Sequence, residues 1–184
     1  MSEAGTHTSI ARARSGATAG SAPLGSAPPR PPGSPTEADV HSVLAEVPDP
    51  ELPVLSVVDL GIVHRVGVTS DGIDVAILPT FVGCPALDVM RATIAEALQD
   101  RFGCPVRVET TFEVPWTSDR ISPAGREALA KVGIAPPADD PNDVRCPFCA
   151  SADVAMDSAF GPTQCRSLFY CRACRQPFEA LKSV

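Results

Sequence analysis

Apolar side chains in the middle of the chain recur at helical spacing in some segments and alternate with polar residues in others. Helices are predicted over residues 36–47, over 85–103 and in the segment SPAGREALAKVG, which Ser122 is expected to cap. Thr36 is expected to cap the first helix, with Asp39 completing a capping box. The predicted buried stripes are Val40, Val43, Leu44 and Val47 in the first helix, and Leu87, Met90, Ile94 and Leu98 in the second.

Alternating apolar and polar residues predict strands in HRVGV (64–68), IDVAIL (73–78) and PVRVETTF (105–112). Asp71 and Gly72 form a turn signal between the first two strands, which are therefore expected to make a hairpin. The second helix separates the second and third strands, and such a connection is typical of a helical crossover between parallel strands. The pattern predicts an α/β fold in which a small three-stranded mixed sheet packs with about three helices.

Composition divides the chain into four parts. Residues 1–35 are rich in Ala, Ser, Gly, Pro and Thr and nearly lack large apolar residues, so a disordered tail is predicted. The α/β domain is assigned to residues 36–134, and a proline-rich linker without periodicity to 135–143. A cysteine-containing module, predicted to be a small β zinc ribbon, covers residues 144–184.

Two C-x-x-C pairs, Cys146/Cys149 and Cys171/Cys174, dominate this C-terminal module. Each pair can place two sulfurs on one side of a tetrahedral Zn(II) site, and a hairpin can bring the pairs together. The 21 residues between the pairs slightly exceed the usual spacing but fit a ribbon in which SLFYC enters the second knuckle. We predict structural zinc on these four cysteines, while iron on the same sulfurs stays open. Cys165 is left outside the ligand set.

Seven cysteines and a net charge of −7 narrow the classes of function. No export signal is recognisable, so the cysteines are expected as reduced thiols or metal ligands in the cytoplasm, not as a disulfide framework. No apolar run approaches the roughly 18–20 residues of a membrane helix, so no membrane association is expected. The negative charge argues against nucleic-acid binding. The ribbon is nevertheless locally basic through Arg145, Arg166, Arg172 and Arg175.

The segment LPTFVGCPAL places Cys84 directly before Pro85. Pro85 suits the first helical position, so Cys84 is expected at the N-cap, where free N–H groups and the helix dipole can lower the pKa of a thiol. Such a thiol could act as a nucleophile or a metal ligand, with Thr80 and Gly83 shaping the approach. The alternative is a small apolar residue that fills the joint between strand and helix.

Asp49, Glu51 and Asp59 lie in a proline-rich loop before the first strand. They could coordinate a metal or position a partner, but capping and turn hydrogen bonds are the favoured interpretation for each residue taken singly. His64 is in register with the apolar residues of its strand, and we expect a hydrogen-bonded histidine at the sheet edge. A Cys–His dyad at Cys84 would depend mainly on His64 as the base.

Three segments, DPELPVLSVVDLGIV, LPTFVGCPAL and PWTSDRISPAGREAL, resemble the small α/β domain of the iron–sulfur cluster assembly family that includes SufT proteins. The segments GIAPP, CPFC and FGPTQCRSLFYCRACRQPFEALK are similar to the D-subunit family (PaaD, also called PaaJ) of the phenylacetyl-CoA epoxidase system. The match covers about residues 36–182, and the combination of both modules is more specific than either alone. The long N-terminal tail departs from the family pattern.

The resemblance implies an accessory role in aerobic phenylacetate degradation, in which a multicomponent monooxygenase epoxidises the ring of phenylacetyl-CoA. A protein of this family would help to mature the system by supplying or repairing the iron–sulfur centre of its reductase component, without catalytic residues of its own. The family's reactive cysteine corresponds to Cys84 with Thr80, and its acidic segment to Asp49 and Glu51. These residues would transiently hold iron or a cluster. A family cysteine also corresponds to Cys165.

Two other functions stay open at this point. A purely structural subunit of the oxygenase would use the ribbon as a protein-interaction surface and would be indifferent to replacement of Cys84. A cysteine-dependent enzyme would use Cys84 as nucleophile and His64 as base, which requires the two side chains within hydrogen-bonding reach.

Overall fold

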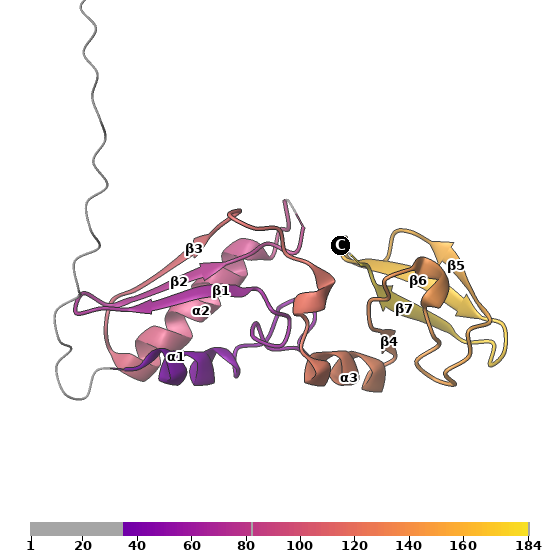
Figure 1. The fold of residues 1–184 in the computed structure, drawn as a ribbon, viewed down its shortest axis with the longest axis horizontal. Helices are drawn as coiled ribbons and strands as arrows, with labels where there is room; N and C mark the ends of the chain where they lie inside the picture. The colour runs from indigo at the N-terminus through magenta and orange to yellow at the C-terminus, as the bar shows by residue number, and fades with distance from the viewer. Residues whose placement is uncertain (1–34, 82, 184) are drawn as a thin grey trace, which may run out of the picture.

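The computed structural model describes residues 35–81 and 83–183, so the predicted disordered tail at residues 1–35 lies outside the described residues except for Pro35. Figure 1 shows an α/β unit and a β unit side by side along the long axis of the molecule, with α3 between them. The helical elements are α1 (Glu37–Leu44), α2 (Leu87–Phe102) and α3 (Pro123–Lys131), with short 3₁₀ turns η1 (Ser118–Arg120) and η2 (Pro141–Asp143).

The first and third helices begin at their predicted caps. The Thr36 hydroxyl accepts a hydrogen bond from the Asp39 N–H at 3.2 Å, and the Asp39 carboxylate accepts from the Thr36 N–H at 2.8 Å, which confirms the capping box. The Ser122 hydroxyl accepts from the Gly125 N–H at 2.9 Å and so caps α3. Helix α2 ends at Gly103, whose φ of 63° is the left-handed conformation that favours glycine.

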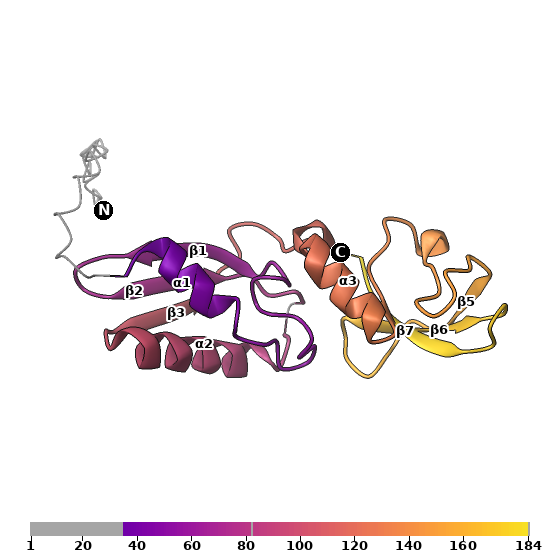
Figure 2. The ribbon, with the colours of Figure 1, turned by 90° about the horizontal axis from the view of Figure 1, so that it is seen from below.

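The three-stranded sheet of the α/β unit has the predicted mixed topology. Its strands are β1 (Val63–Val68), β2 (Ile73–Ile77) and β3 (Val106–Thr110), in the order β1-β2-β3. β1 and β2 form the antiparallel hairpin, and β3 runs parallel to β2 after the crossover through α2. Helices α1 and α2 cover one face of the sheet (Figure 2). Ile94 and Leu98 of α2 share a buried core with Val75 and Ile77 of β2.

The C-terminal unit is a second sheet. Its strands are β4 (Ile134–Ala135), β5 (Val154–Ser158), β6 (Arg166–Cys171) and β7 (Pro177–Leu181), in the order β4-β7-β6-β5. β6 runs into Cys171, as expected for the SLFYC segment. β4 pairs in parallel with β7, so the sheet reaches back to Ala135, where the predicted linker begins. The division of the chain at residues 134 and 143 stays a prediction.

Side chains from both units pack into a common interior. Leu181, at the end of β7, is buried in the same core cluster as Trp116 of the α/β unit. Arg126 of α3 donates from Nη1 to the carbonyl of Pro137 at 2.9 Å and so ties α3 to the segment after β4. The ribbon is therefore docked on the α/β unit. Among the described helices, none combines the length and apolarity that crossing a membrane requires.

Candidate functional site

Four thiols gather at one end of the second sheet. The Sγ atoms of Cys146, Cys149, Cys171 and Cys174 all lie within 4.8 Å of one another. The Cys146–Cys174 and Cys149–Cys171 sulfurs are each 3.6 Å apart. A tetrahedral zinc ion with Zn–S bonds of about 2.3 Å requires sulfur–sulfur edges of about 3.8 Å. The cluster therefore fits a metal ion with four sulfur ligands, and such a site leaves no open position for a substrate.

Tight turns hold each pair of cysteines in this arrangement. The Ala150 N–H donates to the Cys146 carbonyl at 2.8 Å, and the Cys171 N–H donates to the Gln176 carbonyl at 2.9 Å. The backbone N–H of Cys174 lowers the pKa of the Cys171 thiol to about 7. Burial, followed by the neighbouring thiols, raises the pKa of Cys174 to about 12. A bound metal ion is what would hold all four groups as thiolates at neutral pH.

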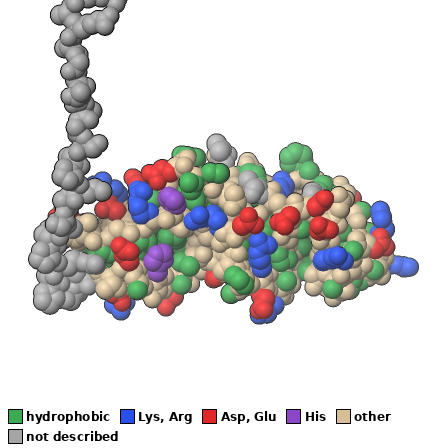
Figure 3. Space-filling view, viewed as in Figure 1, with side chains coloured by type: hydrophobic (Ala, Val, Ile, Leu, Met, Phe, Trp, Pro, Cys, Tyr) green, Lys and Arg blue, Asp and Glu red, His purple; other side chains and the backbone are tan. Residues whose placement is uncertain are grey.

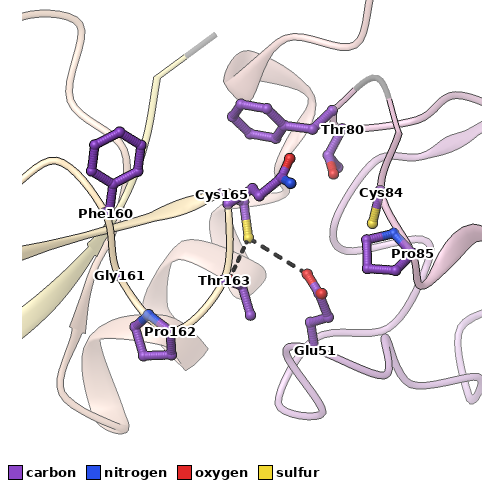
Figure 4. A pocket seen from close by; sticks show the side chains of 11 residues that line it. Glu51, Thr80, Cys84, Pro85, Phe160, Gly161, Pro162, Thr163 and Cys165 are labelled. Atoms are coloured by element: carbon purple, nitrogen blue, oxygen red, sulfur yellow. Dashed lines mark hydrogen bonds between the residues drawn. The ribbon is translucent and has the colours of Figure 1, made fainter.

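A second group of reactive side chains lines a cavity of about 260 Å³ between the two units (Figure 4). The α/β unit contributes the acidic loop and the turn before α2, and the ribbon contributes the loop that precedes β6. Residues on its walls include Glu51, Thr80, Phe81, Cys84, Phe160 and Cys165. The structure thus brings together Glu51, Thr80 and Cys84, three of the predicted iron-handling residues, and adds Cys165 from the ribbon.

The predicted position of Cys84 is wrong in detail. Helix α2 begins at Leu87 with Ala86 as its N-cap, so neither Cys84 nor Pro85 occupies the first helical positions. Burial raises the pKa of the Cys84 thiol, the carboxylates of Glu51 and Asp49 add to the rise, and backbone N–H groups of Ala86 and Leu87 act against it. The expected lowering of this pKa by the helix is therefore wrong, because desolvation and two nearby acids outweigh the hydrogen bonds.

The acidic residues of the proline-rich loop have different surroundings. Asp49 is buried, and its Oδ1 accepts from the N–H groups of Glu51 at 2.9 Å and Leu52 at 2.7 Å. Asp59 accepts from the hydroxyl of Ser122 at 2.6 Å. Turn hydrogen bonds are thus confirmed for Asp49, whereas the carboxylate of Asp59 accepts from the side-chain hydroxyls of Ser122 and Ser56. Glu51 differs, because its carboxylate faces the cavity (Figure 4).

Cys165 lies apart from the four-thiol cluster and faces the α/β unit. Its Sγ is 3.0 Å from the Thr163 hydroxyl and 3.9 Å from Oε2 of Glu51. Burial raises the pKa of this thiol, and the Glu51 carboxylate adds to the rise. The sequence places Cys165 between the two C-x-x-C pairs but contains no signal for the docking that turns it toward Glu51.

His64 is not brought to Cys84. His64 lies on the edge strand β1, as expected, and its imidazole Nε2 is 3.4 Å from Oε2 of Glu113, within ion-pair distance for a protonated imidazole. The walls of the cavities at Cys84 do not include His64 in the part of the chain that the structure describes. Within the described residues, the arrangement therefore offers Cys84 no imidazole base.

The fold and the two cysteine sites define a two-module class: an iron–sulfur assembly-type α/β domain followed by a zinc-ribbon-type module. Residues 37–109 match the family described as "Iron-sulfur cluster assembly protein", and residues 135–182 match "PaaD zinc beta ribbon domain". The chain is 38% identical over 152 residues to the putative D subunit of the 1,2-phenylacetyl-CoA epoxidase of Escherichia coli, covering 79% of this chain and 92% of that protein. The chain therefore belongs to the D-subunit family of the phenylacetyl-CoA epoxidase system.

Other relatives correspond to about half of the chain. A "Fe-S protein maturation auxiliary factor" of Porphyromonas gingivalis is 35% identical over 100 residues, which cover 53% of this chain and 91% of that protein. The crystal structure of a "Domain of Unknown Function DUF59" from Bacillus anthracis is 25% identical, with a TM-score of 0.48, over 50% of this chain and 90% of that one.

Proposed function

We propose that the protein is a non-catalytic accessory component of a phenylacetyl-CoA 1,2-epoxidase system, which assists iron–sulfur cluster assembly or repair in the reductase component. The observation on which this rests is the cavity where Cys84, Thr80 and Glu51 face a common space. Membership of the D-subunit family supports the choice of system, and the relative named as an Fe–S maturation factor supports the choice of task. The proposal includes the cytoplasmic location that the sequence predicts.

The two cysteine sites have different roles in this proposal. The four-thiol cluster holds zinc and keeps the ribbon folded, because four sulfur ligands close the coordination sphere. Cys84, beside Thr80 and Glu51 and next to the buried Asp49, handles iron or a cluster transiently. An exchangeable site requires open coordination positions, and the cavity at Cys84 provides room for them.

Coexpression with the reductase component tests the proposal. Reductase purified anaerobically is compared for iron content and visible cluster absorbance after coexpression with the wild-type chain, Cys84→Ser or Cys104→Ser. Cys104 is a matched control, because it is also a half-buried free thiol but lies outside the cavity wall. Cys84→Ser is expected to lower cluster content severalfold, and Cys104→Ser to leave it unchanged. Full cluster content with Cys84→Ser contradicts the proposal.

A scaffold subunit without metal transfer is the second candidate function. Phe160, at the cavity wall, is 82% exposed, and an exposed aromatic side chain suits a protein contact. This alternative predicts stable, stoichiometric co-purification with the catalytic subunits, indifferent to Cys84→Ser. A nucleic-acid partner has less support, since Lys and Arg side chains are interspersed with acidic ones on the face that Figure 3 shows.

A further inference from the structure

We infer that the cavity between the two units is a site for ferrous iron with ligands from both: thiolates of Cys84 and Cys165 and the carboxylate of Glu51. This inference rests on the proposed function and deepens it, because it gives the ribbon a direct part in metal binding. The ribbon then completes the site that Cys84 begins, in addition to its own four-thiol cluster.

The arrangement of the three side chains supports binding of one shared metal ion. Figure 4 shows Cys165 on the ribbon wall of the cavity, with Glu51 and Cys84 on the facing wall. Both cysteines are free thiols. The Glu51 Oε2 lies 3.9 Å from the Cys165 Sγ, so these two atoms can reach one ion with little movement. Among the described residues only the four ribbon thiols already lie together as a metal-sized group, so the Cys84 side chain would have to turn across the cavity to join Glu51 and Cys165 on the same ion.

Contacts within the ribbon, and one that crosses to the α/β unit, position the loop of Cys165. The Lys182 N–H donates to the Cys165 carbonyl at 2.9 Å, directly after the buried Leu181. Arg166 donates from Nη2 to the Glu51 carbonyl at 3.5 Å and pairs through Nη1 with Glu179 at 2.6 Å. The loop of Cys165 and the loop of Glu51 are thus held together at the point where the thiol and the carboxylate meet.

The charges at the cavity favour a cation. Glu51 forms no ion pair with Lys or Arg within residues 35–81 and 83–183. The nearby Lys182 Nζ instead donates to the Gln164 carbonyl at 2.8 Å and lies over the rings of Phe81 and Phe160. The other nearby cation, Arg166, pairs with Glu179 and reaches only the backbone carbonyl of Glu51. The Glu51 carboxylate is therefore free to bind a divalent ion directly, and binding would displace the thiol protons.

The donor set indicates which cation. Two sulfurs and one carboxylate oxygen suit a borderline ion such as Fe(II), Co(II) or Zn(II), whereas Mg²⁺ and Ca²⁺ prefer oxygen ligands throughout. Three protein ligands leave at least one coordination position open. The cavity of about 260 Å³ has room for a further ligand from solvent or from a recipient protein. This distinguishes the site from the closed four-thiol cluster and suits an ion that is handed on.

Cobalt(II) is the probe for the test. The full chain is prepared anaerobically with one zinc per chain, which occupies the four-thiol cluster because thiolate sites bind Zn(II) more tightly than Co(II). Co(II) is then titrated into wild type, Cys84→Ser, Cys165→Ser and the control Cys104→Ser. Absorbance in the near ultraviolet reports thiolate-to-cobalt charge transfer. Retained zinc and an unchanged far-ultraviolet circular dichroism spectrum verify that each variant is folded.

We expect one Co(II) per wild-type chain beyond the zinc, with the Cys104→Ser titration unchanged. Cys84→Ser and Cys165→Ser should each lose about half of the charge-transfer intensity and bind roughly tenfold or more weakly, because each lacks one of two thiolates. Glu51→Gln should weaken binding and keep the charge-transfer intensity at saturation. If Cys165→Ser does not fold, Cys165→Ala replaces it.

Two results overturn the inference. One is a Cys165→Ser titration identical to wild type while Cys84→Ser abolishes binding, which makes Cys84 the sole thiol ligand and leaves the proposed function standing. The other is a zinc-loaded wild type that shows no thiolate-to-cobalt charge-transfer band when Co(II) is added. The proposed function fails by a different observation, namely reductase cluster content that is indifferent to Cys84→Ser.

Discussion

At the scale of single residues, the surroundings of Cys84 combine burial with negative charge. Glu51 and Asp49 both raise the pKa of this thiol, in addition to desolvation. A low-pKa nucleophile needs the opposite surroundings, with a cation or unopposed N–H groups beside the sulfur. A protonated thiol close to carboxylates is instead suited to a group that loses its proton when a metal ion arrives. This favours metal handling over covalent catalysis.

The burial of a carboxylate beside Cys84 can be tested by comparing the stability of an Asp49 variant with that of wild type. Burial raises the pKa of its carboxyl above the ordinary value of 3.8, so the folded state holds this proton to higher pH than the unfolded state. Ionisation therefore destabilises the fold as the pH rises through and above 3.8. Asp49→Asn keeps an oxygen that can accept from the N–H groups of Glu51 and Leu52 and avoids the buried charge. The variant should gain free energy of unfolding relative to wild type as the pH rises.

Urea unfolding of the zinc-loaded chain without added iron or cobalt, from acidic to neutral pH, provides this comparison. A wild type that becomes more stable than Asp49→Asn with rising pH would contradict the prediction. In the coexpression assay, a variant of undiminished stability that lowers reductase cluster content would assign the negative charge of Asp49 to iron handling and not to folding.

At the scale of elements, α3 is anchored to the acidic loop through its cap. The Ser122 hydroxyl accepts from the Gly125 N–H and donates to Asp59 at 2.6 Å. This bond and the one from Ser56 lower the pKa of the Asp59 carboxyl. Asp59 therefore contributes stability above its unfolded value of 3.8, which is lost as the pH falls through its folded value.

Ser122→Ala removes both the cap and the bond to Asp59. It should lower the free energy of unfolding by about 1–2 kcal/mol at neutral pH. The reason is that the Gly125 N–H loses its acceptor and the Asp59 carboxylate loses a donor, and the two losses add. The loss should shrink as the pH falls below 3.8 and through the lower folded-state pKa of Asp59, since the Ser122 hydroxyl then no longer bonds a carboxylate. Ser42→Ala, in which an exposed hydroxyl on α1 loses only a bond to the Ala38 carbonyl, is the control and should change stability by less than about 0.5 kcal/mol. Equal losses from the two variants would contradict the prediction.

Elements defined by local chemistry could be predicted from the sequence, and those defined by docking could not. The Thr36 and Ser122 caps follow from residue type and spacing alone. Helix α2 starts later than predicted because Cys84–Pro85–Ala86 forms a turn in which the Cys84 carbonyl accepts from the Leu87 N–H at 3.4 Å. A proline suits that turn as well as a first helical position, so the pattern does not separate the two.

At the scale of the whole molecule, the cavity exists because the two units share an interior. Leu181 of the ribbon lies in the core that Trp116 also lines, and Cys165 packs against the same cluster. Neither contact has a sequence signature, since each joins segments far apart in the chain. This is why the sequence assigns Cys84 and Glu51 to a site but leaves Cys165 without a role.

Removal of metal from the four-thiol cluster should therefore open the cavity as well as the ribbon. Among the described residues, a small buried cluster forms the ribbon's own core, so a bound metal would supply much of its folding energy, about 10–16 kcal/mol in zinc-finger peptides. After chelation, hydrogen exchange should lose protection in β5, β6 and β7 but keep it in β2, which is buried under α2. Cys84 and Cys165 should react with maleimide faster, because the ribbon wall that encloses them is lost.

Zinc added back to the chelated protein should restore both protection and slow labelling. Cys149→Ser provides the matched case, because it removes one ligand from the cluster without touching the cavity. In this variant, Cys84 should react with maleimide as fast as it does in the chelated wild type. Rapid labelling confined to the ribbon cysteines, with Cys84 still protected, would mean that the α/β unit shields Cys84 by itself. In that case the ribbon would be a neighbour of the site and not one of its walls.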